Sequence, residues 1–236
     1  MNLATIVLAH GAWSSAWAWK KVRPLMAAAG HTFITPSYTG LGERRHLAGP
    51  SNDLQTHIDD VVGVIEAEEL EDFVLMGHSY GGMVATGVAS RLPGKISKLI
   101  YLDAFVPRDG QALNDLVPAE RRRLIQEGAG DGWSITPNPP PPDTSPEDVA
   151  WIRRHECNQS VKCFAQPVKL SAEPTLPRVY IQCMRYAGTF IRFAERAKSE
   201  PGWTFHELDS SHCPNITAPH ALMDVLAKVL PHDRRR

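Results

Sequence analysis

The stretch that decides the fold spans residues 73–92 and reads Phe-Val-Leu-Met-Gly-His-Ser-Tyr-Gly-Gly-Met-Val-Ala-Thr-Gly-Val-Ala-Ser-Arg-Leu. Its first four residues are apolar and predict a buried strand, because the run is too short for a helix. The next five, 77–81, fit the pattern Gly-x-Ser-x-Gly, and the small and apolar residues after them suit a packed helix. Between a strand and a helix this pattern forms a sharp turn that holds its serine strained and exposed above the sheet. We therefore interpret Ser79 as a nucleophile.

The two glycines of this turn have a steric reason. A Cβ atom at Gly77 or Gly81 would collide with the backbone of the neighbouring strand or helix if the turn is as tight as predicted. The alternative interpretation is an ordinary loop serine between two turn glycines. The buried strand before the turn and the packed helix after it favour the nucleophile.

Composition limits the classes of function. The chain has 236 residues, which suits one α/β domain with a moderate insertion. Its hydrophobic fraction of 43% and charged fraction of 22% are ordinary for a globular protein. A net charge of −1 gives no reason to expect nucleic acid or an anionic membrane surface as a partner, and the basic run at 234–236 suits a solvated tail.

The first residues and the cysteines bear on location. The apolar run at 3–9 follows no basic segment and ends at His10, so it predicts a strand rather than a signal peptide. No segment approaches the ~20 apolar residues of a membrane span. The four cysteines lie at positions 157, 163, 183 and 213 without metal-ligand spacing, so we expect reduced thiols in a cytoplasmic protein.

Strands and helices alternate along the first part of the chain. Apolar strands are expected at 3–9 and 32–37, at the start of the 73–92 stretch and at 96–102, with helices at 16–29 and 53–69. This alternation predicts a doubly wound, mostly parallel sheet of about six strands, and such sheets bind ligands at the carboxyl ends of their strands. His10, Ser79 and Asp103 all lie at such ends.

The alternation breaks between residues 107 and 177. This stretch holds a proline-rich run at 137–142 and two polar helical segments near 116–127 and 146–156, with no strand alternation. We therefore expect a helical lid insertion at 107–177 and a core made of residues 1–106 and 178–236. The core resumes with a strand at 178–183, a helix near 188–199, a strand at 203–208 and a terminal helix at 219–230.

A serine becomes a nucleophile only when a base takes its proton and a third group orients that base. His212 is the candidate base, because it lies in the loop after the last expected strand, where folds of this kind place that histidine. The His-Gly-Ala-Trp loop at 10–13 follows the first strand and offers a backbone N–H for an oxyanion hole.

Four stretches carry a resemblance to a known family. They are residues 10–13, the run from Val22 to His31, residues 77–83, and the Ala-Phe-x-Pro at 104–107. On these stretches the whole chain resembles an α/β-hydrolase of the plant methylesterase and hydroxynitrile lyase group, although 107–177 matches poorly. The resemblance implies the α/β-hydrolase fold, with Ser79 as nucleophile and His212 as base. It also implies an oxyanion hole made of the backbone N–H groups of Ala12 and Tyr80.

The acid of the family pattern is missing from its usual place. The family has an aspartate a few residues after the 178–183 strand, where this chain has Tyr186 and no carboxylate before Glu195. Related folds such as haloalkane dehalogenases place the acid after the preceding core strand, and Asp103 fits that position. The order Ser79, Asp103, His212 keeps the usual order of the three residue types. A loop-capping aspartate is the alternative, and Asp209 is the reserve acid, although it lies awkwardly close to the histidine in sequence.

Two further positions distinguish an esterase from a lyase. The lyases of the group resemble each other in a threonine where this chain has Gly11 and a lysine where it has Cys213. Cyanohydrin cleavage needs that cation to stabilise the developing cyanide, which an uncharged thiol cannot do. The lyase is therefore disfavoured. We expect Gly11 and Cys213, together with Trp13 and His78, to contact the substrate.

The predicted function is that of a serine carboxylesterase, which hydrolyses a small to medium apolar or aryl ester through an acyl-enzyme on Ser79. No cofactor and no metal are expected, and the partner is a small-molecule ester rather than nucleic acid or a membrane. Two alternatives stay open, namely a hydroxynitrile lyase-like or other non-hydrolytic enzyme and a ligand-binding protein on the same fold. A homodimer also stays open.

Overall fold

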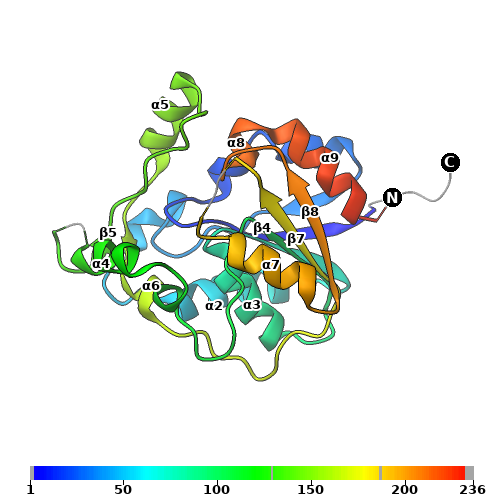
Figure 1. Cartoon of the computed structure of the whole chain (residues 1–236), viewed down its shortest axis with the longest axis horizontal. Helices are drawn as coiled ribbons and strands as arrows, with labels where there is room; N and C mark the ends of the chain where they lie inside the picture. The colour runs from blue at the N-terminus through cyan, green and yellow to red at the C-terminus, as the bar shows by residue number, and fades with distance from the viewer. Residues whose placement is uncertain (1–2, 129, 186–187, 232–236) are drawn as a thin grey trace.

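The computed structural model describes residues 3–128, 130–185 and 188–231, and a six-stranded sheet forms its centre (Figure 1). The strands run in the order β2-β1-β3-β4-β7-β8, and every neighbouring pair is parallel. Their bounds are Thr5–Ala9 (β1), Thr32–Ile34 (β2), Phe73–His78 (β3), Ile96–Leu102 (β4), Arg178–Cys183 (β7) and Trp203–Leu208 (β8). This arrangement confirms the predicted doubly wound α/β sheet of about six strands.

The strand order determines where a ligand would bind. The chain passes from β1 to the edge strand β2 and then crosses to β3 on the other side of β1. The winding therefore reverses between β1 and β3, and ligands of open parallel sheets bind outside the carboxyl ends of the strands at such a point. His10 follows β1 directly, and Ser79 follows β3 directly.

Helices cover both faces of the sheet (Figure 1). Leu54–Ala67 (α2), Gly81–Arg91 (α3) and Ile191–Ser199 (α7) pack on one face, and Arg23–Ala28 (α1), Pro214–Thr217 (α8) and Pro219–Val229 (α9) pack on the other. Side chains of β3 alternate between the two cores, with Phe73 and Leu75 in the first and Val74 and Met76 in the second. Because both faces are buried, this strand reads as one continuous apolar run.

A proline explains why two elements differ from their predicted ranges. The single helix expected at 16–29 is split into a 3-10 helix, Ala16–Trp19 (η1), and α1. Pro24 lies in the first turn of α1, where its missing N–H costs no hydrogen bond, and it would clash within a continuous helix. The strand expected at 32–37 ends at Ile34, since Pro36 has no N–H with which to continue the pairing. A further 3-10 helix, Gly42–Leu47 (η2), follows β2.

The segment between β4 and β7 is built from short elements. They are Leu113–Asp115 (η3), Ala119–Glu127 (α4), Ser134–Ile135 (β5), Pro146–His155 (α5), Gln159–Ser160 (β6) and Lys162–Ala165 (α6). The two helical stretches were predicted, but the antiparallel pairing of β5 with β6 was not, because two-residue strands are too short to show alternation. In Figure 1, α4, β5 and α6 gather beside the sheet, and α5 stands apart at the upper left.

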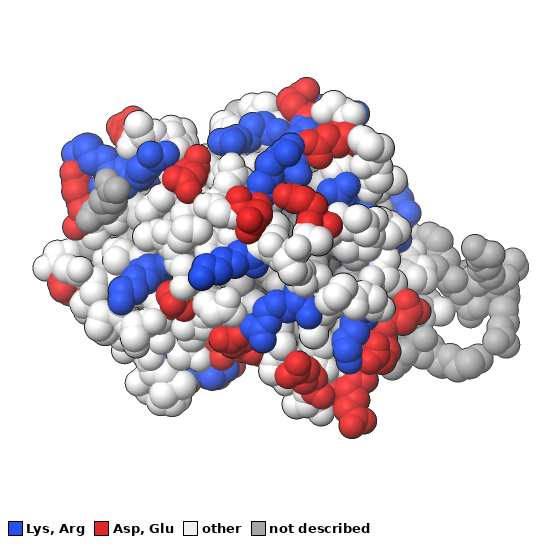
Figure 2. All heavy atoms as spheres, turned by 90° about the horizontal axis from the view of Figure 1, so that it is seen from below, with Lys and Arg blue, Asp and Glu red and all other residues white. Residues whose placement is uncertain are grey.

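The surface is mixed in charge. Figure 2 shows Lys and Arg interspersed with Asp and Glu over the face that it presents, in keeping with a net charge of −1. Such a face produces no extended field of one sign. Within the described ranges, every helix is too short or too polar to cross a membrane.

Candidate active site

The turn at 77–81 is as tight as the sequence predicted. Ser79 has a φ of +55°, in the left-handed region that non-glycine residues rarely adopt. A Cβ atom at Gly81 would overlap the backbone carbonyl of Ala9 on β1, and one at Gly77 would lie 2.7 Å from the carbonyl oxygen of Gly81. The steric reason given for both glycines is therefore confirmed. Strain of this kind persists only where the surrounding structure holds it, and it is frequent at active sites.

Ser79, His212 and Asp103 form one chain of hydrogen bonds. His212 Nε2 lies 2.9 Å from Ser79 Oγ, and His212 Nδ1 lies 2.7 Å from Asp103 Oδ2. A carboxylate only accepts, so Nδ1–H donates to Asp103 and Nε2 is left to accept the hydroxyl proton of Ser79. These three residues come from the ends of β3, β4 and β8, so the parallel sheet brings them to one edge.

Asp103 is held in an unusual position. It is fully buried, has a φ of +42°, and its Oδ1 accepts the backbone N–H of Cys183 at 3.3 Å. Burial raises the pKa of this carboxyl, and the hydrogen bond from His212 opposes that shift. Asp209, the reserve candidate, is exposed and accepts two hydrogen bonds from Arg185, which lower the pKa of its carboxyl. The structure therefore places Asp103 rather than Asp209 at Nδ1 of His212.

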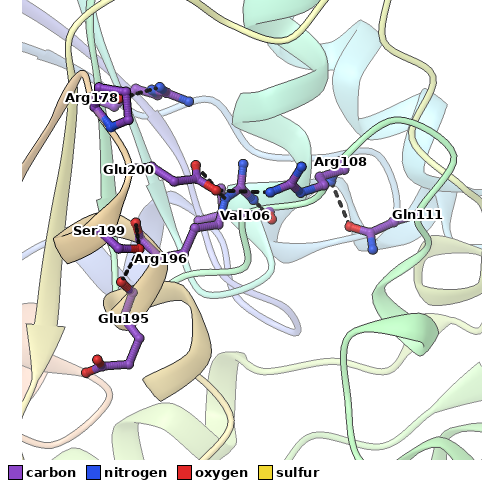
Figure 3. Close-up of polar contacts among 9 residues, drawn as sticks. Val106, Arg108, Gln111, Arg178, Glu195, Arg196, Ser199 and Glu200 are labelled. Atoms are coloured by element: carbon purple, nitrogen blue, oxygen red, sulfur yellow. Dashed lines mark hydrogen bonds and ion pairs between the residues drawn. The ribbon is translucent and has the colours of Figure 1, made fainter.

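The loop that carries Asp103 is fixed from two sides. The buried Tyr180 on β7 donates its hydroxyl proton to the carbonyl of Ala104 at 3.0 Å. Arg196 on α7 donates to the carbonyl of Val106 at 3.1 Å and also pairs with Glu200, which binds Arg108 as well (Figure 3). These contacts tie residues 103–108 to β7 and α7.

Ala12 and Tyr80 are the residues whose backbone N–H groups are predicted to form an oxyanion hole. Ala12 and Tyr80 both line the cavity described next, and in the described part of the chain neither backbone N–H donates to a protein acceptor. Tyr80 is the residue before the first turn of α3, where the partial positive charge of the helix dipole is found. Donors so placed can stabilise an oxygen anion.

A cavity of about 420 Å³ lies above these groups. Its lining includes the four residues that sequence reasoning assigned to the substrate, namely Gly11, Trp13, His78 and Cys213. Sequence reasoning missed most of the apolar wall, which includes Phe105, Leu113, Val117, Ile125, Phe164, Phe190 and Ile216. Most of these residues lie in segments without a motif. The one sequence signal that could have indicated them is an apolar residue within an otherwise polar stretch. The wall suits an apolar or aromatic group.

Two of the polar side chains that line the cavity, His78 and Cys213, are kept neutral. Burial lowers the pKa of His78 to about 3, and its Nε2 lies 2.8 Å from the carbonyl oxygen of His212, so the neutral ring donates there. Burial also raises the pKa of Cys213 to about 12, so this side chain is a thiol at neutral pH. At Gly11 a Cβ atom would lie 3.3 Å from His78 Nδ1 and 3.4 Å from Ser79 Cβ, so the missing side chain leaves room beside the serine.

A parallel sheet with a strained serine after β3, a histidine after its last strand and a carboxylate at a neighbouring strand end defines an α/β-hydrolase. The chain belongs to the alpha/beta hydrolase family, whose pattern matches residues 6–225. Methylesterase 2 and an alpha-hydroxynitrile lyase of Arabidopsis thaliana, each 34% identical over 43% of this chain, confirm the resemblance drawn from its motifs.

Particular relatives support this placement. The chain is 36% identical over 239 residues to a carbendazim hydrolyzing esterase of Nocardioides sp. (strain SG-4G), covering 95% of this chain and 99% of that protein. It is 34% identical to Methylesterase 2 of Arabidopsis thaliana over 43% of this chain and 39% of that one. An extracellular alpha/beta-hydrolase from a Paenibacillus species shares the fold, with a TM-score of 0.82 and 24% identity over 98% of this chain and all of that one. The chain is thus an esterase-type hydrolase of the α/β fold.

Proposed function

We propose that the protein is a serine carboxylesterase that works through an acyl-enzyme on Ser79. The observation that carries this proposal is the chain of hydrogen bonds from Ser79 through His212 to Asp103 at the base of an apolar cavity. A serine, a histidine and a buried carboxylate in this order activate a hydroxyl for acyl transfer.

The reaction has two halves. In the first, His212 Nε2 takes the hydroxyl proton as Ser79 Oγ bonds to the ester carbonyl carbon, and the carbonyl oxygen becomes an anion facing the N–H groups of Ala12 and Tyr80. The bond to the alcohol oxygen then breaks, and the imidazolium protonates the leaving alcohol. In the second half, the same imidazole takes a proton from the water that attacks the acyl carbon. The acyl–Oγ bond then breaks, the imidazolium returns the proton to Ser79 Oγ, and the acid leaves. Asp103 orients the ring and stabilises its charged form.

The cavity supports a small to medium apolar or aryl ester as the substrate. Its volume of about 420 Å³ and its aromatic wall suit a flat ring joined to a small alcohol. The name of the relative that is 36% identical adds a more specific candidate, the ester bond of an aryl carbamate. A small-molecule ester of this kind is the partner that we propose.

The segment 107–177 is proposed as a lid. Leu113, Val117, Ile125 and Phe164 belong to it and line the cavity, so this segment covers the serine with apolar side chains. Closure of an active site by such a segment excludes bulk water and strengthens every electrostatic interaction inside.

A lyase on the same fold is less well supported. Cleavage of a cyanohydrin needs a cation beside the histidine, but the neighbouring Cys213 is a neutral thiol whose pKa burial raises to about 12. The open space at Gly11 also lacks the side chain that the lyases carry there. A binding protein without catalysis would not need a strained serine hydrogen-bonded to a histidine that is itself bonded to a buried carboxylate.

Burst kinetics with Ser79→Ala as the control test the proposal. Wild-type protein mixed with a p-nitrophenyl ester of an aryl acid is expected to release one equivalent of nitrophenol per active site in a fast phase. Ser79→Ala should lose both the burst and the turnover, by roughly 10⁶-fold in kcat, with an unchanged unfolding midpoint. Turnover by a folded Ser79→Ala protein at the wild-type rate would exclude the serine mechanism.

A further inference from the structure

Trp13 links the proposed oxyanion hole to the 107–177 segment. It follows Ala12 directly, and its φ of +57° is a conformation that a bulky residue keeps only when contacts hold it. Because the peptide unit is planar, whatever fixes the N–H of Trp13 also fixes the carbonyl end of Ala12. The N–H of Ala12 lies on the other side of its own Cα atom, so a fixed Ala12–Trp13 peptide unit limits the directions that this N–H can take.

Both nitrogens of Trp13 donate to one rung of the β5–β6 pair. The backbone N–H donates to Gln159 Oε1 at 2.9 Å, and the indole Nε1–H donates to the carbonyl oxygen of Ile135 at 3.1 Å. Ile135 and Gln159 are opposite each other in the register of the two strands. Gln159 is 2% exposed, so its bond to Trp13 is shielded from water.

The same segment also contacts the other half of the proposed hole. The ring of Phe164 on α6 lies 5.6 Å from the ring of Trp13 and 5.6 Å from the ring of Tyr80, measured between centroids. Phe164 thus contacts Tyr80 itself and Trp13, the neighbour of Ala12, so the 107–177 segment touches both sides of the proposed hole.

We infer that Gln159 is a positioning residue for the oxyanion hole, and that it acts by fixing the peptide unit between Ala12 and Trp13. This inference rests on the proposed function. The β5–β6 pair holds the loop after β1 through Gln159 and Ile135. The loop thereby keeps the geometry that the transition state needs. Loss of this support would misplace an oxyanion donor, while the apolar wall that binds the ground state would be unchanged.

The experiment compares two ketone inhibitors, because only one of them creates an oxygen anion. An aryl trifluoromethyl ketone takes up Ser79 Oγ to form a hemiketal whose oxygen is an anion in the hole, whereas the matching aryl methyl ketone only occupies the cavity. Gln159→Met has nearly the same shape without an acceptor. It should weaken the trifluoromethyl ketone and lower kcat by a similar factor, roughly 10- to 100-fold, without changing KM or the affinity for the methyl ketone.

Two further variants separate positioning from general loss of structure. Gln159→Glu keeps an acceptor oxygen and should retain the wild-type ratio of the two ketone affinities, even if the fold is less stable. Ser160→Ala changes the next residue of β6, whose hydroxyl accepts the N–H of Lys162 at 3.3 Å, and should leave both affinities unchanged. If Gln159→Met does not fold, Trp13→Phe removes the bond to the Ile135 carbonyl and should shift the ratio in the same direction by a smaller factor.

The outcomes distinguish this inference from the proposed function. If wild-type protein binds the trifluoromethyl ketone no better than the methyl ketone, the serine mechanism fails and the inference fails with it. If wild-type protein shows the preference and folded Gln159→Met keeps it in full, the inference alone is overturned. Equal losses for both ketones, or a Gln159→Glu protein as impaired as Gln159→Met, would also overturn it.

Discussion

The loops after β4 and β7 start side by side but differ in chemistry. Leu102 and Ile181 pair near the ends of these two strands, so their tips are neighbours in the sheet. The first residue after β4 is Asp103, whereas the chain after β7 has no carboxylate until Glu195 on α7. Tyr186, which the family resemblance puts in the usual place of the acid, lies outside the described residues.

An acid can therefore reach the histidine from the end of either strand, and here it comes from β4. Adjacent strands are about 4.8 Å apart, so a side chain on either tip can reach the same imidazole. Asp103 spans this gap, since Oδ2 accepts from His212 and Oδ1 accepts the N–H of Cys183 at the end of β7. The β7 tip thus supports the acid with its backbone instead of supplying it.

Asp103→Asn, which changes the acid at the end of β4, is expected to lower kcat the most. The amide has no negative charge to stabilise the imidazolium and can favour the wrong ring tautomer, so kcat should fall by roughly 10²- to 10⁴-fold. Steady-state kinetics with an aryl ester provide the measurement. A variant with near-normal kcat would remove Asp103 from the mechanism.

The same variant should change how stability depends on pH. Because burial raises the pKa of Asp103, the unfolded chain loses this proton first as pH rises above the ordinary value of 3.8, and folding of the wild type becomes less favourable. Asparagine does not titrate. Urea unfolding should therefore show Asp103→Asn gaining stability relative to wild type as pH rises from acid to neutral. A relative stability that falls over this range would contradict the buried carboxylate.

A smaller effect is expected from Tyr180→Phe, which removes the hydrogen bond from β7 to Ala104. The loss should cost about 1–2 kcal/mol of stability and lower kcat by less than about tenfold through a looser Asp103. Tyr101→Phe is the matched control, because the Tyr101 hydroxyl is also buried but bonds to Thr86 Oγ1 at 2.7 Å. The control should lose stability without loss of kcat, and an equal loss of kcat in both variants would show that the link to Asp103 is unimportant.

The smallest effect is expected from Asp209→Asn. This carboxylate is exposed and paired with Arg185, and ion pairs at the surface contribute little because water and salt screen them. Both kcat and KM should stay within about twofold of wild type. A large fall in kcat here would return the role of acid to the reserve candidate.

Sequence reasoning located most of the sheet because buried parallel strands are continuous apolar runs. The strands at 178–183 and 203–208 have the predicted bounds, and the turn around Ser79 has the predicted strain. The sequence also predicted Ser79, Asp103 and His212 as one catalytic set. It could not exclude Asp209 as the acid, because order along the chain does not give the distance between two side chains.

The parts that sequence reasoning missed depend on contacts between distant residues. Gln159 and Trp13 are 146 positions apart, and nothing local to either one indicates that they share a hydrogen bond. The pairing of β5 with β6 and the apolar residues of the cavity wall in 107–177 were missed for the same reason, since each is fixed by tertiary packing. The division into a core and a lid stays a prediction.

The most direct test of the account is an NMR measurement of the proton between His212 and Asp103. In protein with ¹⁵N-labelled histidine, the Nδ1 proton of His212 should give a strongly deshielded resonance, because it is donated to a buried carboxylate at 2.7 Å. We expect this resonance in wild type and in Asp209→Asn, and its loss or a large upfield shift in Asp103→Asn. A resonance unchanged in Asp103→Asn but lost in Asp209→Asn would contradict it.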